Sequence, residues 1–190
     1  MITARPALFD DRDRVAAMLA RAFQDDPAFS CIFPDPVDRA ARLPRLFRLS
    51  FDSDGRTGMR LVADGAATLW RGPGHARTGW GEMVRQAVPI VAALGGNTAR
   101  ALRVSGAIDA HMPADPFWYL HYAGCDPDHQ GKGLGSAVVA AGLERVGGLP
   151  VYLETARETN VGFYQRLGFA ATEEWQVGSG GPRFWSMRHG

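Results

Sequence analysis

The chain has 190 residues, 46% hydrophobic and 22% charged, a composition typical of globular proteins. Its 21 basic and 20 acidic residues leave a formal net charge of +1, so no overall electrostatic attraction favours a nucleic acid or an anionic membrane as a partner. The length predicts a single domain over residues 1–190. No apolar signal-peptide segment or membrane-spanning run is recognisable, so we expect a cytoplasmic protein.

The expected elements begin with a strand over 2–8 and a helix with the apolar stripe Val15, Met18, Leu19, Ala22 and Phe23. A short helix over 29–33 and a third helix over 37–51 follow, and Pro44 predicts a break or kink in the third. The turn Asp64-Gly65 predicts a hairpin of two strands over 59–63 and 67–71.

The second half of the chain predicts alternating helices and strands. They are helices over 80–94 and 97–112, a strand over 117–125, a helix to about 145, a strand over 150–155, a helix over 160–167 and strands over 169–177 and 183–188. The order indicates a mixed sheet covered by helices, an α+β or α/β domain. Cys31 and Cys125 lie in apolar stretches without a CxxC pair, so we expect free thiols, and we expect no metal site.

One glycine-rich segment carries a chemical signal. It reads Gln130-Gly131-Lys132-Gly133-Leu134-Gly135-Ser136 between a strand and a helix. Glycines let backbone N–H groups surround an anion, and a helix N-terminus adds about half a positive charge, so this segment predicts a phosphate cradle. A Walker loop does not fit, because Asp126 stands where its first glycine belongs. The dinucleotide fingerprint does not fit either, because Ser136 takes the place of its third glycine.

Two motifs resemble a known family. Gln130, Gly133 and Gly135 match the Q-x-x-G-x-G motif of the GNAT N-acyltransferases, and the stretch from Asn160 to Phe169 resembles that family's N-x-x-x-Y-x-x-x-G-F segment. From Phe117 onward the chain is most similar to the puromycin N-acetyltransferase branch. The resemblance implies a mostly antiparallel sheet, split by an acetyl-CoA cleft and wrapped by helices. It also implies direct acetyl transfer from acetyl-CoA to a primary amine of a small molecule.

The resemblance also implies roles for individual residues. The backbone at Ala123, Gly124 and Cys125, together with Asn160, would hold the pantetheine arm. The segment Gln130, Gly131, Lys132, Gly133, Leu134, Gly135 and Ser136 would hold the phosphates. Tyr164 would be the general acid, because a tyrosine with a pKa near 10 stays protonated and can donate to a departing thiolate with a pKa near 8.5.

The general base stays open between two residues. Glu154 ends the strand over 150–155, and His121 lies in the strand over 117–125, on one face with Phe117 and Tyr119. Either residue could be the general base, and Glu154 could instead bind the acceptor amine. The alternative for each residue is a purely structural role. Related sequences often carry His where this chain has Phe117, so the chain departs from the family pattern at that position.

The acceptor is less well determined. Asp26, Phe29, Phe33, Trp70 and Tyr119 are candidates for lining its pocket, with Trp80 as a further aromatic. Freeing the lone pair of a lysine-like amine at neutral pH costs about 4 kcal/mol, against under about 1 kcal/mol for an α-amine. A site without a strong base therefore favours an α-amine, such as that of a puromycin-like antibiotic or metabolite. The alternatives are a non-catalytic acyl-CoA sensor and an enzyme for protein amines, as a monomer or homodimer.

Overall fold

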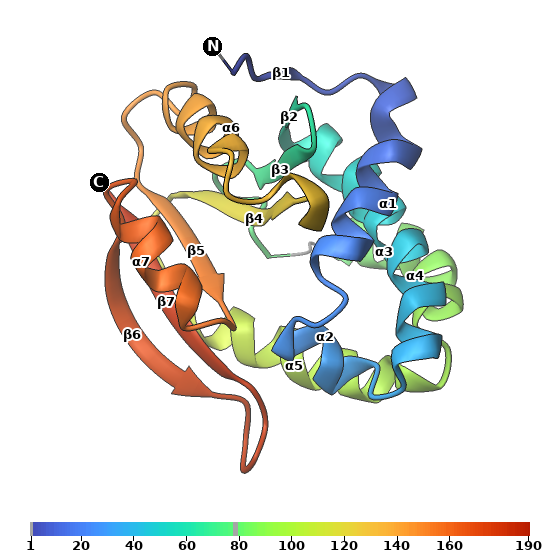
Figure 1. Cartoon of the computed structure of the whole chain (residues 1–190). Helices are drawn as coiled ribbons and strands as arrows, with labels where there is room; N and C mark the ends of the chain where they lie inside the picture. Colours follow the sequence, from blue (N-terminus) through green and yellow to red (C-terminus); the bar gives the residue numbers. More distant parts are fainter. Residues whose placement is uncertain (1, 78–79) are drawn as a thin grey trace.

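The computed structural model describes residues 2–77 and 80–190. Its seven strands form one sheet in the order β1-β2-β3-β4-β5-β7-β6 (Figure 1). The strands are β1 (Arg5–Pro6), β2 (Gly58–Ala63), β3 (Ala66–Arg71), β4 (Trp118–Cys125), β5 (Val151–Thr155), β6 (Ala170–Gln176) and β7 (Arg183–His189). All neighbours are antiparallel except β4 and β5, which are parallel. The expected mixed, mostly antiparallel sheet is confirmed.

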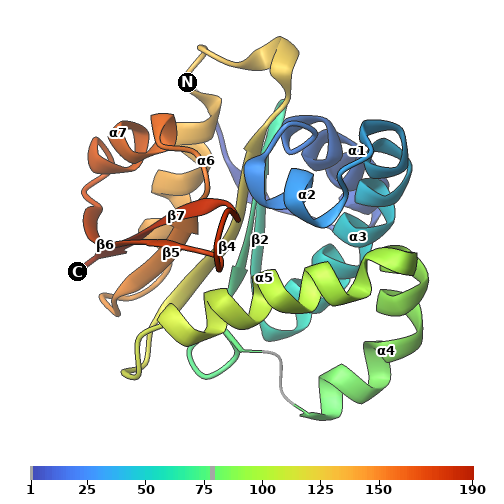
Figure 2. The same ribbon diagram turned by 90° about the horizontal axis from the view of Figure 1, so that it is seen from below.

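Helices cover both faces of the sheet (Figure 2). They are α1 (Arg12–Ala22), α2 (Pro27–Ile32), α3 (Pro36–Thr57), α4 (Trp80–Leu94), α5 (Thr98–His111), α6 (Leu134–Leu143) and α7 (Thr159–Gln165). Short 3-10 turns cover Phe9–Asp11, Gly95–Asn97 and Pro127–His129. Helices α1 to α5 lie on one side and α6 and α7 on the other (Figure 2). None of the helices within 2–77 and 80–190 is both long and apolar enough to cross a membrane.

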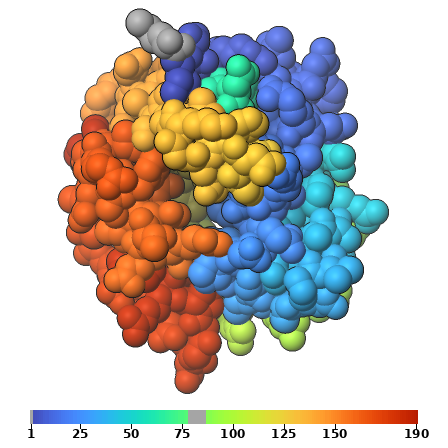
Figure 3. Space-filling view, in the orientation of Figure 1, coloured from blue at the N-terminus to red at the C-terminus, as the bar shows by residue number. Residues whose placement is uncertain are grey.

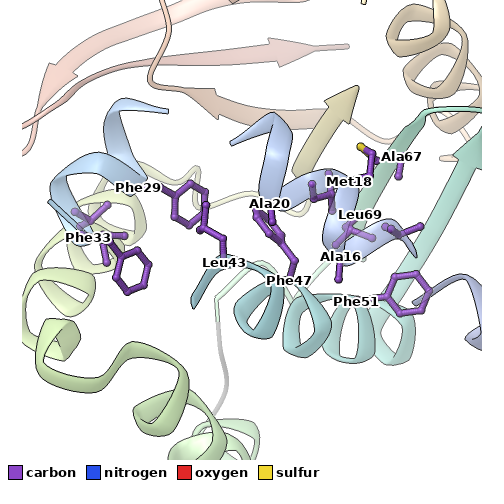
Figure 4. Close-up of a cluster of buried hydrophobic side chains, with 14 of the residues drawn as sticks. Ala16, Met18, Ala20, Phe29, Phe33, Leu43, Phe47, Phe51, Ala67 and Leu69 are labelled. Atoms are coloured by element: carbon purple, nitrogen blue, oxygen red, sulfur yellow. The ribbon is translucent and has the colours of Figure 1, made fainter. Parts of the chain in front are cut away.

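The larger core lies between α1, α2, α3 and the sheet (Figure 4). The predicted stripe of α1 is confirmed, since Val15, Met18 and Leu19 are buried in this core. Phe29 and Phe33 of the α2 region are buried there too, with the ring of Phe29 packed edge-on against Phe23. These two phenylalanines pack the core rather than line a pocket.

The predicted break at Pro44 is wrong, because α3 continues through it from Pro36 to Thr57. A proline inside a helix costs about 3 kcal/mol through its missing N–H and its ring. Its neighbours Leu43 and Phe47 are fully buried, and burying each contributes roughly 1.5–3 kcal/mol. Tertiary packing on this face therefore offsets the local cost.

A second core fills the other face, beneath α6 and α7. Trp70 of β3 is fully buried there, against the helix backbone at Gly142. It was a candidate for an aromatic acceptor pocket, but its ring is enclosed by packed side chains. A Cβ at Gly142 would overlap the Trp70 ring, so this glycine sets how closely α6 approaches the sheet.

Replacing Gly142 by alanine tests this close approach. Alanine is the better helix former by about 1 kcal/mol, but overpacking a core costs roughly 1–3 kcal/mol. We expect Gly142→Ala to lower the free energy of unfolding by about 1 kcal/mol in urea titrations. Gly106→Ala is the matched control, because nothing lies within 4 Å of a Cβ at this position of α5. We expect it to raise the stability by about 0.5–1 kcal/mol. Equal effects at both positions would contradict the packing explanation.

Candidate functional site

The parallel strands β4 and β5 separate soon after they meet. They pair only at Trp118 with Val151 and at Tyr119 with Tyr152. Beyond these pairs lies a cavity of about 530 Å³. A hollow is visible there between the yellow loop before α6, the orange α7 region and the blue α1–α2 region (Figure 3). Its lining is Ala22, Phe23, Asp26, Ala123, Gly124, Cys125, Gln130, Gly131, Gly133, Leu134, Gly135, Ser136, Val138, Arg157, Thr159, Asn160, Phe163, Tyr164 and Arg166.

The glycine loop and the N-terminus of α6 form one wall of this cavity. Gly131 and Gly133 have φ values of 78° and 77°, a backbone conformation that side chains other than glycine rarely adopt. Gly133 is the N-cap of α6, and no side chain caps the helix. The N–H groups of the first turn are therefore available to an anion. Lys132 is not in the lining, and its ammonium donates to the Asp128 carbonyl at 3.2 Å.

The end of β4 forms the second wall, through Ala123, Gly124 and Cys125. Gly124 also has a packing role, because a Cβ there would lie 2.6 Å from Leu19 Cδ2. The missing side chain lets α1 lie directly against β4. The side chain of Gln130 donates to the Cys125 carbonyl at 3.5 Å, which ties the glycine loop to the strand.

The third wall comes from α7 and the turn before it. Asn160 donates to Thr155 Oγ1 at 3.3 Å, joining the start of α7 to the end of β5. Two guanidinium groups, of Arg157 and Arg166, also line the cavity. Arg166 lies inside the motif that runs from Asn160 to Phe169, at a position that the motif leaves unspecified, and Arg157 precedes that motif by three residues. Together with the glycine loop they favour a ligand with phosphate groups.

Tyr164 of α7 lies in the cavity wall with 7% of its surface exposed. Burial, and to a lesser degree the Asp26 carboxylate, raise its pKa well above the usual value for tyrosine. Its hydroxyl is therefore protonated at neutral pH. Asp26 Oδ1 caps α2 by accepting from Ala28 N at 2.9 Å and Phe29 N at 3.3 Å. Asp26 therefore combines a structural cap with a place in the cavity wall.

A second polar group lies where the two strands separate. The Tyr119 and Tyr152 rings face each other there, with centroids 6.4 Å apart. His121 and Glu154 each follow two residues later on their strands. Burial raises the pKa of Glu154 to about 8, although the hydroxyls of Tyr119 and Tyr152 oppose the shift. Its Oε1 is buried and accepts no hydrogen bond from the described part of the chain.

A β-bulge sets the direction of His121. Leu69 pairs with Tyr122 and Trp70 with Leu120, so His121 is the extra residue of β4. The bulge turns Tyr122 to the same face as Tyr119, where its ring packs against Phe47 with centroids 5.0 Å apart. Strict alternation along β4 would put Tyr122 on the opposite face, with Trp118 and Leu120, and the bulge is what prevents this.

His121 has a buried partner on α3. Its Nδ1 lies 2.7 Å from Asp54 Oδ2, and Arg71 Nε donates to Asp54 Oδ1 at 2.8 Å. Burial opposes ionisation of Asp54, but His121 and Arg71 hold its pKa below the usual value. Burial and Arg71 lower the pKa of His121 against the effect of Asp54. These two directions favour an ionised Asp54 beside a neutral imidazole.

Sequence motifs do not single out Asp54, although a signal exists. Phe47, Phe51 and Asp54 follow at helical spacing, which puts this carboxylate on the buried face of α3. A carboxylate on a buried face needs charged or hydrogen-bonding partners. Among the acceptor candidates, Tyr119 lies at the strand separation, whereas Phe29, Phe33 and Trp70 are packed in the cores. The Trp80 side chain lies outside the described residues.

The raised pKa of Glu154 predicts a pH-dependent stability. In the unfolded chain this carboxyl ionises near its ordinary value of 4.5, and in the folded protein near 8. Between these values the folded state holds an extra proton, so its stability falls as the pH rises. We expect Glu154→Gln to become more stable relative to the parent protein as the pH rises from about 5 to 8.5. The gain should be on the order of 4 kcal/mol. Urea titrations of both proteins measure it, and a pH-independent difference would contradict the shifted pKa.

Comparisons with known proteins agree with this geometry. A sequence model of the Acetyltransferase (GNAT) family matches residues 68–169, more than half of the chain. The fold is similar to that of histone acetyltransferase HPA2 and related acetyltransferase from Corynebacterium glutamicum. Identity is 26% and the TM-score 0.76, over 98% of this chain and 94% of that one. Arylalkylamine N-acetyltransferase 2 from Aedes aegypti shares the fold at 14% identity and a TM-score of 0.65, over 98% and 97% of the two chains. Polyamine N acetyltransferase from Drosophila melanogaster also shares the fold, at 16% sequence identity and a TM-score of 0.63, over 99% of this chain and 99% of that one. The chain belongs to the GNAT family of acetyl-CoA-dependent N-acetyltransferases.

Proposed function

We propose that this chain, as one domain, transfers the acetyl group of acetyl-CoA to a primary amine of a small molecule. The observation that carries the proposal is the split between β4 and β5. Tyr164 lies protonated in the cavity wall, and His121 and Glu154 lie on β4 and β5 two residues beyond the last paired residues of these strands. Direct transfer needs a proton donor for the departing sulfur and a proton acceptor for the attacking amine. This arrangement supplies both.

The residues of the cavity fit the donor. The glycine loop and the uncapped start of α6 suit its phosphates, and Arg157 and Arg166 add positive charge. The ends of β4 and β5 no longer bond to each other, so the backbone at Ala123 to Cys125 is available to the pantetheine amides. Asn160 lies on the opposite wall of the same channel.

The chemistry divides among a few side chains. Acetyl-CoA supplies an acetyl thioester, whose C–S bond breaks as the C–N bond of the amide forms. Tyr164 gives its proton to the sulfur, so that free CoA leaves as a thiol. His121 and Glu154 lie where the amine would enter, one to take its proton and the other to hold it. Cys31 and Cys125 have no assigned part in this direct route.

The acceptor we propose is an amine with a low pKa, such as the α-amine of a puromycin-like compound. Burial lowers the pKa of His121, and it keeps Glu154 mostly protonated at neutral pH by raising its pKa to about 8, so neither side chain is a strong base there. A lysine-like ammonium would cost about 4 kcal/mol to deprotonate at neutral pH, and an α-ammonium under about 1 kcal/mol. The buried Glu154 favours a compact amine that can reach it.

Release of the CoA thiol from acetyl-CoA in the presence of different amines tests this function. The amines are puromycin, an arylalkylamine, agmatine, lysine and a histone peptide. We expect the highest kcat/KM with an α-amine. Preference for the histone peptide or free lysine would replace the small-molecule acceptor by a protein amine. Acetyl-CoA binding without thiol release for any amine would favour a sensor.

Removal of the Tyr164 hydroxyl tests the general acid. We expect Tyr164→Phe to lower kcat on the order of 10²-fold, because the thiolate must leave without a proton donor. Its Kd for acetyl-CoA, measured by calorimetry, should stay within about twofold of the parent value. Tyr122→Phe is the matched control, because Tyr122 is a partly buried tyrosine that lies outside the cavity lining. Equal kcat values for the two variants would remove Tyr164 from the mechanism.

Binding of CoA tests the contribution of the two arginines that line the cavity, Arg157 and Arg166. We expect Arg166→Gln to raise the Kd for CoA about three- to tenfold, since an exposed charge pair contributes about 1 kcal/mol. The effect should shrink as the salt concentration rises. Arg145→Gln, an exposed arginine near the C-terminal end of α6 and outside the cavity lining, should leave the Kd unchanged. A loss of affinity that does not depend on salt would argue against charge attraction.

A further inference from the structure

We propose that Asp54 is a positioning residue that holds His121 as the proton acceptor for the incoming amine, with the imidazole Nε2 presented to the split. This inference rests on the proposed acetyl transfer and names the group that receives the proton. Asp54 comes from α3 and His121 from the bulge of β4, 67 positions later. No motif connects the two residues, and only the fold brings them together.

The short contact with Asp54, together with the lowered pKa of that carboxyl, indicates which ring nitrogen carries the proton. Asp54 Oδ2 lies 2.7 Å from His121 Nδ1, and Asp54 is fully buried. An ionised carboxylate can only accept, so Nδ1 must carry the proton and donate it. The Nε2 lone pair is then left free. Within the described residues Nε2 makes no hydrogen bond, and the His121 side chain is 14% exposed.

Neighbouring groups keep the ring neutral and oriented. Arg71 of β3 balances the charge of Asp54, so His121 need not become a cation to satisfy this carboxylate. The ring of Tyr119 stacks on His121 with centroids 5.3 Å apart, and that of Tyr122 lies 3.9 Å away at 35°. These contacts restrict rotation of the imidazole. A neutral, oriented imidazole with a carboxylate on its other nitrogen is an arrangement suited to a general base.

A second buried carboxylate shows what a purely structural arrangement looks like in this chain. Asp11 is also buried, and its two oxygens accept from Arg5, Arg14 and the backbone N–H of Leu8. The hydrogen-bond partners of Asp11 are thus two arginines and one main-chain N–H group, none of which titrates near neutral pH. Asp54 instead uses one oxygen for Arg71 and the other for a titratable ring at the strand separation.

Following the proton through the reaction gives His121 and Glu154 different roles. As the amine nitrogen bonds to the acetyl carbon, its surplus proton moves to His121 Nε2, and the imidazolium is stabilised by ionised Asp54. The proton then leaves to solvent and restores the neutral ring, while the Tyr164 phenolate takes a proton back from solvent, so both groups return to their starting states. Glu154, whose buried Oε1 has no hydrogen bond in the described part of the chain, is left to bind the amine and orient it.

The first experiment reads the tautomer directly and needs no turnover. Nitrogen NMR of the five histidines, with His121 assigned by its loss in His121→Gln, reports which ring nitrogen carries the proton. In the parent protein at pH 7 we expect a neutral His121 ring that is protonated at Nδ1. In Asp54→Asn we expect this tautomer to be no longer the predominant one. A ring protonated at Nε2, or at both nitrogens, at pH 7 would overturn the proposal. The measurement on the parent protein holds even if Asp54→Asn does not fold.

The second experiment measures the kinetic role, with Asp11→Asn as the matched control. We expect Asp54→Asn to lower kcat about 10²-fold or more, since a positioned general base contributes roughly 10²–10⁴-fold. The KM for acetyl-CoA should stay within about threefold. Asp11→Asn also removes the charge of a buried carboxylate that is paired with arginines, and it should lower the melting temperature without lowering kcat. In a His121→Ala background, Asp54→Asn should have no further effect on kcat.

These results separate the inference from the function on which it rests. Equal kcat losses for Asp54→Asn and Asp11→Asn, or a full Asp54→Asn effect in the His121→Ala background, would overturn the positioning role while acetyl transfer stands. An Nδ1 tautomer in a protein that binds acetyl-CoA but acetylates none of the amines would overturn the proposed function, and the inference with it.

Discussion

The parallel pairing of β4 with β5 ends after two residue pairs, and the site depends on this short contact. A longer pairing would satisfy the backbone N–H and C=O groups of both strands and close the sheet. Beyond Tyr119 and Tyr152 those groups are left for a ligand, because a buried backbone polar group needs a partner. The flanking helices keep the split from closing, with α1 packed on β4 at Gly124 and α7 joined to β5 through Asn160.

The split also explains where the buried polar groups gather. One group runs from Arg71 through Asp54 to His121 on the β4 side. Another runs from Trp175 Nε1 to Ser186 Oγ at 2.9 Å and on to the Tyr152 hydroxyl at 2.8 Å, beside Glu154. Burying such groups is unfavourable unless each finds a partner. Three buried side-chain atoms of the described residues lack a hydrogen bond, Thr68 Oγ1, Trp70 Nε1 and Glu154 Oε1, and Glu154 is the one that follows the last paired residue of β5.

Local signals predicted most of the fold, and the failures have identifiable causes. The Asp64-Gly65 hairpin was predictable because Gly65 has a φ of 83°, which its position in a tight turn requires. The continuous α3 was not, because burial of Leu43 and Phe47 outweighs the cost of Pro44. Trp70 looked like a pocket residue because an isolated tryptophan gives no sign of what packs on it. Only the fold brings Gly142 against its ring.

The sequence by itself determined the order of the elements, the family and the glycine loop before α6, because these features depend on residues close together along the chain. The spacing of Gln130, Gly133 and Gly135 and a helix start are local properties. Only the tertiary structure decided the surroundings of His121. A single inserted residue in β4 turns Tyr122 to the other face, and Asp54 lies 67 positions away. A bulge has no local sequence signature, and long-range partners meet only when the sheet and α3 pack together.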